Sequence, residues 1–326
     1  MLFLETPVSG CRRLTACLRH FLRHLRRSVC AILCNVSDHS LPERLPFIEQ
    51  IRYGWRSRES LLCVGLDPDL NRLPAQYRDG ANRIGDGMLD FCRDIVDATA
   101  DLVCAFKPQI AYFAALGLEN ELEALIGHIH RAHPGVPVIL DAKRSDIGDT
   151  AKLYAREAFE RYGADAVTVN PYLGSESIAP FLEYEGRGVI VLCRTSNPDS
   201  AWLQQYPDES APLYLRVART AADWNESGNV MLVAGATYPE ELGRIRAAVG
   251  EMPLLVPGIG AQGGDLAAVL REGADSRGEG LVINTSRAVL YADAEDAAGG
   301  ARAAAEAFRA EICRLQAELG PDRAVV

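Results

Sequence analysis

The stretch that decides the fold is VILDAKRSDIGDT, which covers residues 138–150. A short apolar run ends at Asp141, and Lys143 and Asp146 follow within the next few residues. Charged groups beside a buried strand are costly unless they pair with one another, so this crowding indicates a polar site at the end of the strand. Residues two apart on a strand point to the same side, and we therefore expect Asp141 and Lys143 to face a common space.

The chain continues this pattern on both sides, because apolar runs of strand length alternate with longer amphipathic segments. The predicted strands are 61–66, 102–107, 136–141, 165–170, 188–193, 230–235, 253–258 and 281–284. Near-continuous apolar strands that alternate with helices are typical of a parallel sheet covered on both faces. Eight such units in about 270 residues predict an α/β fold, a single (β/α)8 TIM barrel with an irregular N-terminal extension. A doubly wound open sheet is the alternative, but it more naturally has a GxGxxG turn after its first strand, where this chain has GLDPDL.

The start of the chain differs from the rest. Residues 1–40 contain six arginines and only two acidic residues, with leucines on one face of a possible helix. We expect residues 1–44 to be a basic extension, either disordered or translated from a start codon placed too early, and residues 45–326 to be the catalytic barrel. An organelle transit peptide is the alternative to a cytoplasmic location, because such peptides are rich in Arg and poor in acids.

Composition excludes several classes of protein. The 326 residues carry a formal net charge of −10, which argues against nucleic acid as a partner because phosphate binding needs clustered Lys and Arg. No apolar run approaches the ~20 residues that span a bilayer, so we expect no membrane segment. The nine cysteines are odd in number and irregularly spaced, which favours reduced, buried cysteines over a disulfide framework.

Polar or glycine-rich residues follow seven of the eight predicted strands at their C-terminal ends. They are Asp67, Lys107, Asp141, Asn170, Arg194 to Ser196, Gly258 to Gln262, and Ser286 with Arg287. In barrel enzymes this end carries the active site. Acids and bases that alternate can share a semi-buried site, and a salt-bridge cluster that only stabilises the barrel is the alternative.

Several motifs resemble those of a known family. DAKRSDIGDT resembles the D-x-K-x-x-D-I-x-x-T signature of orotidine 5′-monophosphate decarboxylases. Six further segments of this chain resemble the longer bacterial-type branch of that family: SLLCVGLDPDL, CAFKPQIAYF, VTVNPYLGSES, VLCRTSNP, LLVPGIGAQGGD and VINTSRAVLYA. The resemblance spans roughly residues 45–318. It implies a carboxy-lyase that converts orotidine 5′-monophosphate to UMP without metal or cofactor, the last step of de novo pyrimidine nucleotide synthesis.

The resemblance also implies roles for the charged residues. Asp141 would lie beside the departing carboxylate, and Lys143 would stabilise the charge that develops at C6 and then protonate that carbon. Lys107 would bridge Asp141 and a ribose hydroxyl, and Asp67 would accept hydrogen bonds from the ribose. Asp146, the fourth catalytic residue, and Thr150 would reach into the site of a partner subunit, which makes a homodimer part of the prediction.

The remaining predicted substrate contacts concern the phosphate and the base. They are Ser196 on the pyrimidine edge, Gly260, Gln262 and Arg287 toward the phosphate, and Ser286 as a further substrate contact. Glycines allow backbone N–H groups to approach the anion, arginine can contact it through two nitrogens, and a helix that begins after Gly264 would add its positive end.

Three histidines, His128, His130 and His133, do not enter this prediction. Their H-x-H spacing could suggest a metal, but residues 128 and 130 do not share a helix face, so we expect surface or helix C-terminal residues and no metal site.

Two rival functions remain open. One is a Mg²⁺-dependent sugar-phosphate barrel, such as a 3-keto-gulonate-6-phosphate decarboxylase or a hexulose-phosphate synthase, and the other is a non-catalytic sensor of a phosphorylated ligand.

Overall fold

The computed structural model describes residues 44–79, 83–259 and 264–320. The prediction for residues 1–44 therefore lies, apart from Arg44, outside the described part of the chain. Among the described residues, no helix has both the length and the apolar character that a membrane crossing requires.

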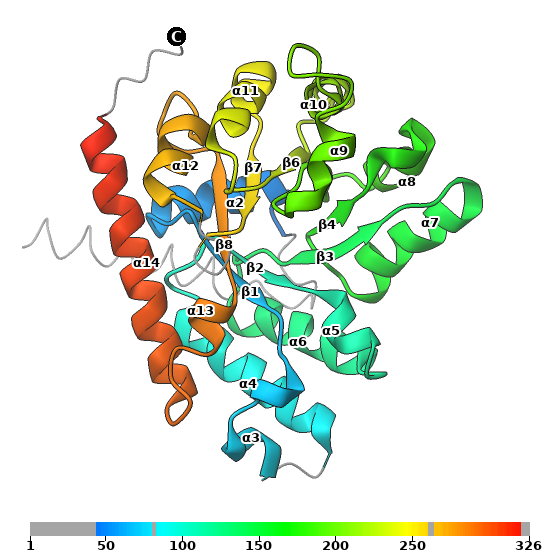
Figure 1. Ribbon diagram of the computed structural model, residues 1–326. Coiled ribbons are helices and arrows are strands. Elements are labelled where there is room, and N and C mark those ends of the chain that lie inside the picture. The colour runs from blue at the N-terminus through cyan, green and yellow to red at the C-terminus, as the bar shows by residue number, and fades with distance from the viewer. Residues whose placement is uncertain (1–43, 80–82, 260–263, 321–326) are drawn as a thin grey trace, which may run out of the picture. The chain divides into compact units, whose positions relative to one another are not determined.

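Parallel strands form the centre of the molecule (Figure 1). They are β1 (Leu62–Leu66), β2 (Ala105–Pro108), β3 (Ile139–Arg144), β4 (Ala166–Val169), β5 (Gly188–Arg194), β6 (Val230–Ala234), β7 (Leu254–Pro257) and β8 (Leu281–Thr285). Their order in the sheet is β2-β1-β8-β7-β6-β5-β4-β3, and bridges Phe106↔Val138 and Gln109↔Asp141 join β2 to β3. The predicted (β/α)8 barrel is confirmed, since these bridges nearly close the ring.

Helices follow the strands and surround them. The longer ones are α4 (Ile84–Thr99), α6 (Glu119–Ala132), α7 (Gly148–Arg156), α10 (Leu213–Asp223), α11 (Pro239–Val249), α12 (Leu266–Gly273) and α14 (Ala297–Leu319). Short helices are α3 (Ala75–Asp79), α5 (Ile110–Ala114), α8 (Ala179–Leu182), α9 (Ala201–Gln204) and α13 (Arg287–Leu290), and a π turn, Glu157–Arg161, continues α7. The last long helix, α14, packs against α4 and α12 and so completes the outer layer.

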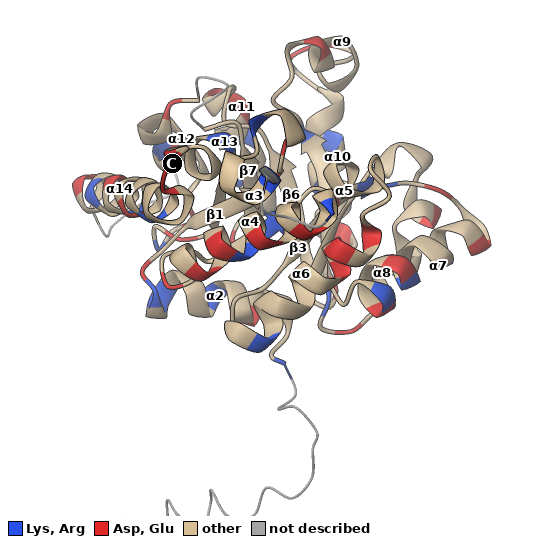
Figure 2. Ribbon diagram, turned by 90° about the horizontal axis from the view of Figure 1, so that it is seen from below, with Lys and Arg blue, Asp and Glu red and all other residues tan. Residues whose placement is uncertain are grey.

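The outer helices expose their charged faces and bury their apolar ones. In α4, the buried side chains Met88, Phe91, Cys92, Ile95 and Val96 recur every three or four residues, as the period of an α-helix requires. Acidic residues gather on the exposed faces of α4 and α6 (Figure 2). Cys63, Cys104 and Cys193 are free and buried within or beside strands, as the sequence predicts.

A helix that the sequence analysis did not predict, α2 (Phe47–Ser57), covers the N-terminal face of the barrel. The Phe47 N–H donates to Gly186 O at 2.8 Å, just before β5, and Gln50 Nε2 donates to Asp165 Oδ1 at 3.2 Å, just before β4. Phe47, Ile51 and Trp55 are buried and spaced by four residues, which is a helical signal visible in the sequence. Because α2 covers this face, the opposite face at the C-terminal strand ends is the one open to ligands.

Candidate active site

A cavity of about 610 Å³ lies at the C-terminal ends of the strands. That volume is within the range of small-molecule sites. Seven of the predicted site residues line it: Asp67, Lys107, Asp141, Lys143, Ser196, Ser286 and Arg287. Residues in or just beyond the C-terminal ends of β1, β2, β3, β5 and β8 therefore meet in one space, although they are far apart in the sequence.

The centre of the cavity floor is a carboxylate between two ammonium groups. Lys107 Nζ lies 2.9 Å from Asp141 Oδ2, and Lys143 Nζ lies 2.6 Å from Asp141 Oδ1. Lys107 and Asp141 are buried, whereas 47% of the Lys143 side chain is exposed. The network therefore fixes Lys107 within the protein and presents Lys143 to the cavity.

The electrostatics keep Asp141 and Lys107 charged. Burial opposes ionisation of Asp141, but the charges of Lys107 and Lys143 outweigh it and lower the pKa of that carboxyl. Burial likewise opposes protonation of Lys107, but the charges of Asp141 and Asp67 outweigh it and raise the pKa of the ammonium. Each buried charge is thus stable because of its neighbours, and removal of one partner leaves the other uncompensated.

Lys143 does not lie on a regular strand. Its φ is +48°, and the register between β3 and β4 shifts between Leu140 and Arg144. Non-glycine residues in the left-handed region are uncommon and cluster at functional sites, where surrounding contacts hold them. Asp141 and Lys143 do converge as expected, but an irregular strand end and not simple alternation produces the convergence.

The contact that holds this strand end comes from Thr168 on β4, which the sequence analysis did not single out. Thr168 Oγ donates to Asp141 Oδ1 at 2.8 Å and accepts the N–H groups of Ala142 at 3.0 Å and Lys143 at 2.9 Å. One buried hydroxyl therefore orients the carboxylate and the backbone of the lysine together. The signal in the sequence is a single Thr in the otherwise apolar strand AVTV.

Asp67 follows β1 and has one unsatisfied group. In the described part of the chain, its Oδ1 is buried and has no hydrogen-bond partner. A buried polar atom without a partner costs roughly 1–3 kcal/mol, so this oxygen is ready to accept a donor from a ligand in the cavity. Hydroxyl groups of a sugar are donors of the required kind.

Two glycines allow close approach at the rim of the cavity. A Cβ at Gly235 would lie 2.8 Å from the Cα of Ser196, and a Cβ at Gly65 would lie 2.0 Å from Ser286 Oγ. Both positions therefore need glycine for the neighbouring serine to keep its place. Ser196 is held further through its carbonyl oxygen, which accepts from Thr237 Oγ at 3.2 Å.

Arg194, at the end of β5, holds the loop that carries Ser196. Its guanidinium donates to Thr195 O at 3.0 Å and to Gln204 Oε1 at 3.2 Å, and it also bonds Glu241 of α11. It lies 3.8 Å from the ring centroid of Tyr238. The arginine is buried, so it serves the loop's shape and does not present its charge to the cavity.

The predicted phosphate end is only partly described. Arg287 is exposed at the start of α13, lines the cavity, and has no ion-pair partner among the described carboxylates. Gly258 has φ +106°, which favours glycine, whereas Gly260 and Gln262 lie outside the described residues.

The expected contribution of the next helix is not supported. Helix α12 begins at Leu266, and its first free N–H groups, those of Ala267 and Ala268, are capped by the Asp265 carboxylate. A carboxylate already satisfies these donors, so the helix end is a poor anion site.

Asp146 and Thr150 are not among the residues that line the cavity of their own chain. Asp146 Oδ1 accepts from the N–H of Ile147 at 2.8 Å, and Thr150 is exposed on α7. Ile147, which follows Asp146 directly, and Leu153, one turn after Thr150 on α7, are exposed apolar side chains. Their place relative to a second subunit stays a prediction.

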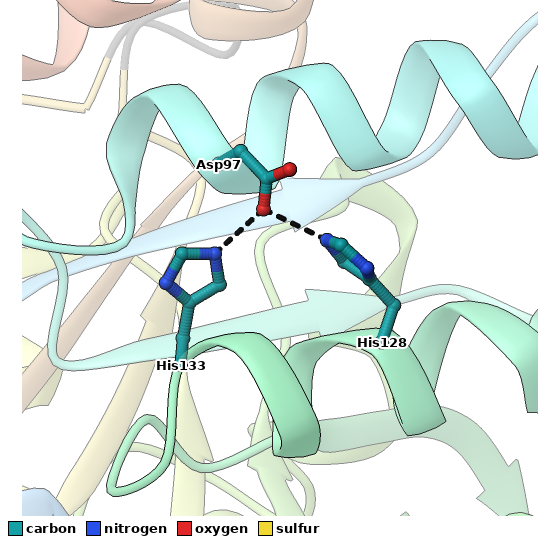
Figure 3. Close-up of side chains that lie close together, drawn as sticks. All are labelled: Asp97, His128 and His133. Atoms are coloured by element: carbon teal, nitrogen blue, oxygen red, sulfur yellow. Dashed lines mark hydrogen bonds and ion pairs between the residues drawn. The ribbon is translucent and has the colours of Figure 1, made fainter.

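The histidines lie elsewhere. His128 and His133 converge on Asp97 of α4 at the outer surface (Figure 3), and His130 Nε2 lies 3.0 Å from Asp165 Oδ2. None of the three lines the cavity at the strand ends. Acid–base chemistry in that cavity therefore falls to lysine and aspartate.

Fold and site together define a class: the chain is a (β/α)8 barrel enzyme with a charged cavity of nucleotide size at the C-terminal strand ends. More specifically, the chain belongs to the Orotidine 5'-phosphate decarboxylase / HUMPS family, whose model matches residues 60–303. The family resemblance seen in the sequence is thereby confirmed.

Individual relatives agree with this assignment. The chain is 60% identical to the orotidine 5'-phosphate decarboxylase of Azoarcus sp. over 261 residues, 79% of this chain and 95% of that protein. It is 58% identical to that of Dechloromonas aromatica over 253 residues, 77% of this chain and 92% of that one. Among solved structures, the OMP decarboxylase of Leishmania donovani is similar with a TM-score of 0.71 and 39% identity, covering 83% of this chain and 99% of that one.

Proposed function

We propose that this protein decarboxylates orotidine 5′-monophosphate to UMP, the last step of de novo pyrimidine nucleotide synthesis. The observation that carries the proposal is the Lys107–Asp141–Lys143 network, which presents one ammonium to the cavity from a strained strand end. Family membership and the named relatives support the same substrate.

The chemistry follows from the placement of the charges. The bond between C6 and the carboxyl carbon breaks, CO₂ leaves, and the electron pair remains on C6. The Lys143 ammonium stabilises this developing negative charge and transfers a proton to C6, after which Lys143 regains a proton from solvent. Asp141 lies beside the substrate carboxylate, and the repulsion between them is relieved when CO₂ leaves.

The rest of the cavity suits the remainder of the nucleotide. Asp67 Oδ1 accepts a ribose hydroxyl, and Lys107 donates to another while it holds Asp141. Ser196 contacts the pyrimidine edge, and Ser286 and Arg287 contact the phosphate. Gly260 and Gln262 lie outside the described residues and stay predicted phosphate contacts. Binding of the phosphate, far from C6, supplies energy that is used in the transition state.

The reaction needs no metal in this proposal, unlike that of a Mg²⁺-dependent sugar-phosphate barrel. Both oxygens of Asp141 already bond ammonium groups, so a divalent cation would have to displace Lys107 or Lys143. A non-catalytic sensor would not need a charged lysine in a left-handed conformation, which costs energy of order 1–3 kcal/mol.

The test is the loss of orotidine 5′-monophosphate absorbance in the presence of the purified chain, with and without EDTA. We expect turnover that is the same in both conditions. Activity that disappears with EDTA and returns with Mg²⁺ would support the sugar-phosphate alternative, and tight binding of UMP without turnover would support the sensor.

We also propose that the active form is a homodimer in which Asp146 and Thr150 complete the partner's site. Both residues lie outside their own cavity and beside exposed apolar side chains such as Ile147 and Leu153. Exposed apolar clusters of this kind are typical of interfaces between subunits.

Mixing two inactive variants tests this arrangement. A dimer of one Lys143→Ala chain and one Asp146→Ala chain has one site with both native residues and one site with neither. Random pairing of equal amounts should therefore restore about a quarter of native activity. If Asp146 served its own chain, no mixed dimer would contain an intact site and activity would stay at the level of the single variants.

A further inference from the structure

A second cluster of ionisable side chains lies on the outer surface, between helices α4 and α6 (Figure 3). Asp97 is in the last turn of α4, His128 is on α6, and His133 is the first residue after α6. Both helices end on the side from which β2 and β3 start, so the cluster lies toward the N-terminal face of the barrel, away from the cavity.

The two imidazoles point at one carboxylate oxygen. His128 Nε2 lies 2.7 Å from Asp97 Oδ1, and His133 Nε2 lies 2.6 Å from the same oxygen. Their nearest potential ligand atoms all lie within 4.8 Å of one another. Two imidazole nitrogens and one carboxylate oxygen this close together are a ligand set that zinc and similar ions use with water in the remaining position.

The surroundings favour a cation. The histidine side chains are about three-quarters buried, at 22% and 23% exposed, while the Asp97 side chain is 49% exposed and leaves the point of convergence open to solvent. Within the described part of the chain, the ion-pair partners of Asp97 are these two histidines, and no lysine or arginine is bound to it. Among the described residues, the cluster therefore combines a carboxylate with no bound lysine or arginine.

We propose that Asp97, His128 and His133 form a binding site for a divalent transition-metal ion of the zinc type. In this site each Nε2 carries its lone pair toward the metal, and its proton moves to Nδ1 or to solvent. Ligands of a tetrahedral ion lie about 3.3 Å apart, so the nitrogen–oxygen separations open by roughly 0.6 Å when the metal enters. Rotation of side chains on the surface can supply that movement.

The bound ion links α4 to α6. These helices pack side by side and precede β2 and β3, the strands that carry Lys107, Asp141 and Lys143. The site therefore serves stability and not catalysis, as expected for chemistry at the N-terminal end of a barrel. The H-x-H motif of His128 and His130 does not indicate this metal site in the sequence. The second histidine of the site is His133, beyond the end of α6, and the third ligand, Asp97, comes from α4.

Titration of the metal-stripped full chain with Zn²⁺ or Co²⁺ tests the site. We expect a micromolar site that Asp97→Asn and His128→Ala each weaken at least about tenfold, since even residues behind the ligands affect affinity by that factor. At free Zn²⁺ about a hundredfold above Kd, the native chain should gain about 4 °C or more in Tm, and neither variant should.

The matched control is Asp90→Asn, which removes the same charge from the same exposed face of α4, two turns earlier. It should bind metal as the native chain does. Cysteines elsewhere in the chain can also bind zinc, so the test compares the metal affinity of the variants with that of the native chain. The Co²⁺ absorption spectrum of the site should lack thiolate-to-metal charge-transfer bands.

Metal affinity and Tm shifts that are equal in the native chain, Asp97→Asn and His128→Ala would overturn the proposal. Metal binding that Asp90→Asn weakens as much as Asp97→Asn does would also overturn it. Decarboxylation should be unchanged in Asp97→Asn, with or without metal, which separates this site from the proposed catalytic one.

Discussion

Two carboxylates in this protein each lie between two nitrogen groups, and they differ in almost everything else. Asp141, in the cavity, shares its two oxygens between Lys107 and Lys143, and its side chain is 11% exposed. Asp97, on the outer surface, offers one oxygen to both His128 and His133, and its side chain is 49% exposed. The first cluster is a fixed set of charges inside the protein, and the second is an open set of ligands.

The difference shows how burial decides what the same kind of cluster can do. In the cavity, a low effective dielectric constant strengthens each interaction, and Lys107 and Lys143 lower the pKa of Asp141. At the surface, water screens the interactions, and histidines can be neutral and bind a metal. The predicted effects of substitutions therefore fall steeply from the first cluster to the second.

The largest effect is expected for Lys143→Ala. Removal of the ammonium eliminates both the charge opposite C6 and the proton donor, so kcat should fall at least about 10⁴-fold. Affinity for UMP, measured by calorimetry, should change little because the phosphate contacts remain. Residual turnover within tenfold of the native rate would contradict the assigned role.

Asp141→Asn should destabilise the fold, because it leaves the buried Lys107 ammonium without its main partner. Loss of one member of a buried pair costs about 3–5 kcal/mol, to be measured by urea unfolding. The folded-state pKa of Asp141 is lowered, so its contribution is present above the unfolded pKa of about 3.9 and is lost as the pH falls through the folded value.

The pH dependence of this variant sharpens the test. The difference in stability from the native chain should be largest between about pH 5 and pH 9 and shrink below pH 4, where Asp141 takes up a proton in the unfolded chain. It should also shrink near pH 10 and above, where Lys107 loses its proton in the unfolded chain. A difference that stayed constant from pH 3 to pH 11 would mean that charge is not its source.

Thr168→Val tests what positions the cluster. The variant keeps the side-chain volume but removes the bonds to Asp141 and to two backbone N–H groups, so kcat should fall about a hundredfold while KM changes little. Thr168→Ser keeps the hydroxyl and should recover most of the rate. Equal rates for the Ser and Val variants would show that the hydroxyl is not needed.

Arg287→Ala should act mainly on binding. Loss of one charged contact to the phosphate should raise KM about ten- to thirtyfold, with a smaller change in kcat. Affinity for inorganic phosphate or UMP provides the independent measurement. Unchanged affinity for both would place the phosphate elsewhere in the cavity.

The smallest effect is expected for Asp97→Asn in the absence of metal. Partly exposed ion pairs contribute about 0–1 kcal/mol, so urea unfolding should show a loss of no more than about 1 kcal/mol. A loss as large as that of Asp141→Asn would remove the contrast between the two clusters.

The sequence predicted the barrel because apolar runs of strand length and amphipathic segments alternate along the chain, and each predicted strand overlaps an observed one. It also predicted which residues gather at the strand ends, since all parallel strands of a barrel deliver their C-terminal residues to one face. Asp67, Lys107, Asp141, Lys143, Ser196, Ser286 and Arg287 line one cavity.

What the sequence did not show depends on contacts between distant segments. The role of Thr168 needs the irregular end of β3 beside β4, and the meeting of Asp97 with His133 needs the packing of α4 on α6. The anion site expected at the start of α12 is not supported, because the Asp265 side chain caps that helix. An Asp directly before a helix is a capping signal that the sequence analysis did not use. Periodicity predicts elements, whereas these details follow from how the elements pack.

The most direct measurement is a crystal structure of the complex with UMP. We expect the C6 edge of the pyrimidine within about 3.5 Å of Lys143 Nζ, the ribose against Asp67 and Lys107, and the phosphate at Arg287. A nucleotide bound with its phosphate at Lys143, or with its pyrimidine ring outside the cavity, would contradict it.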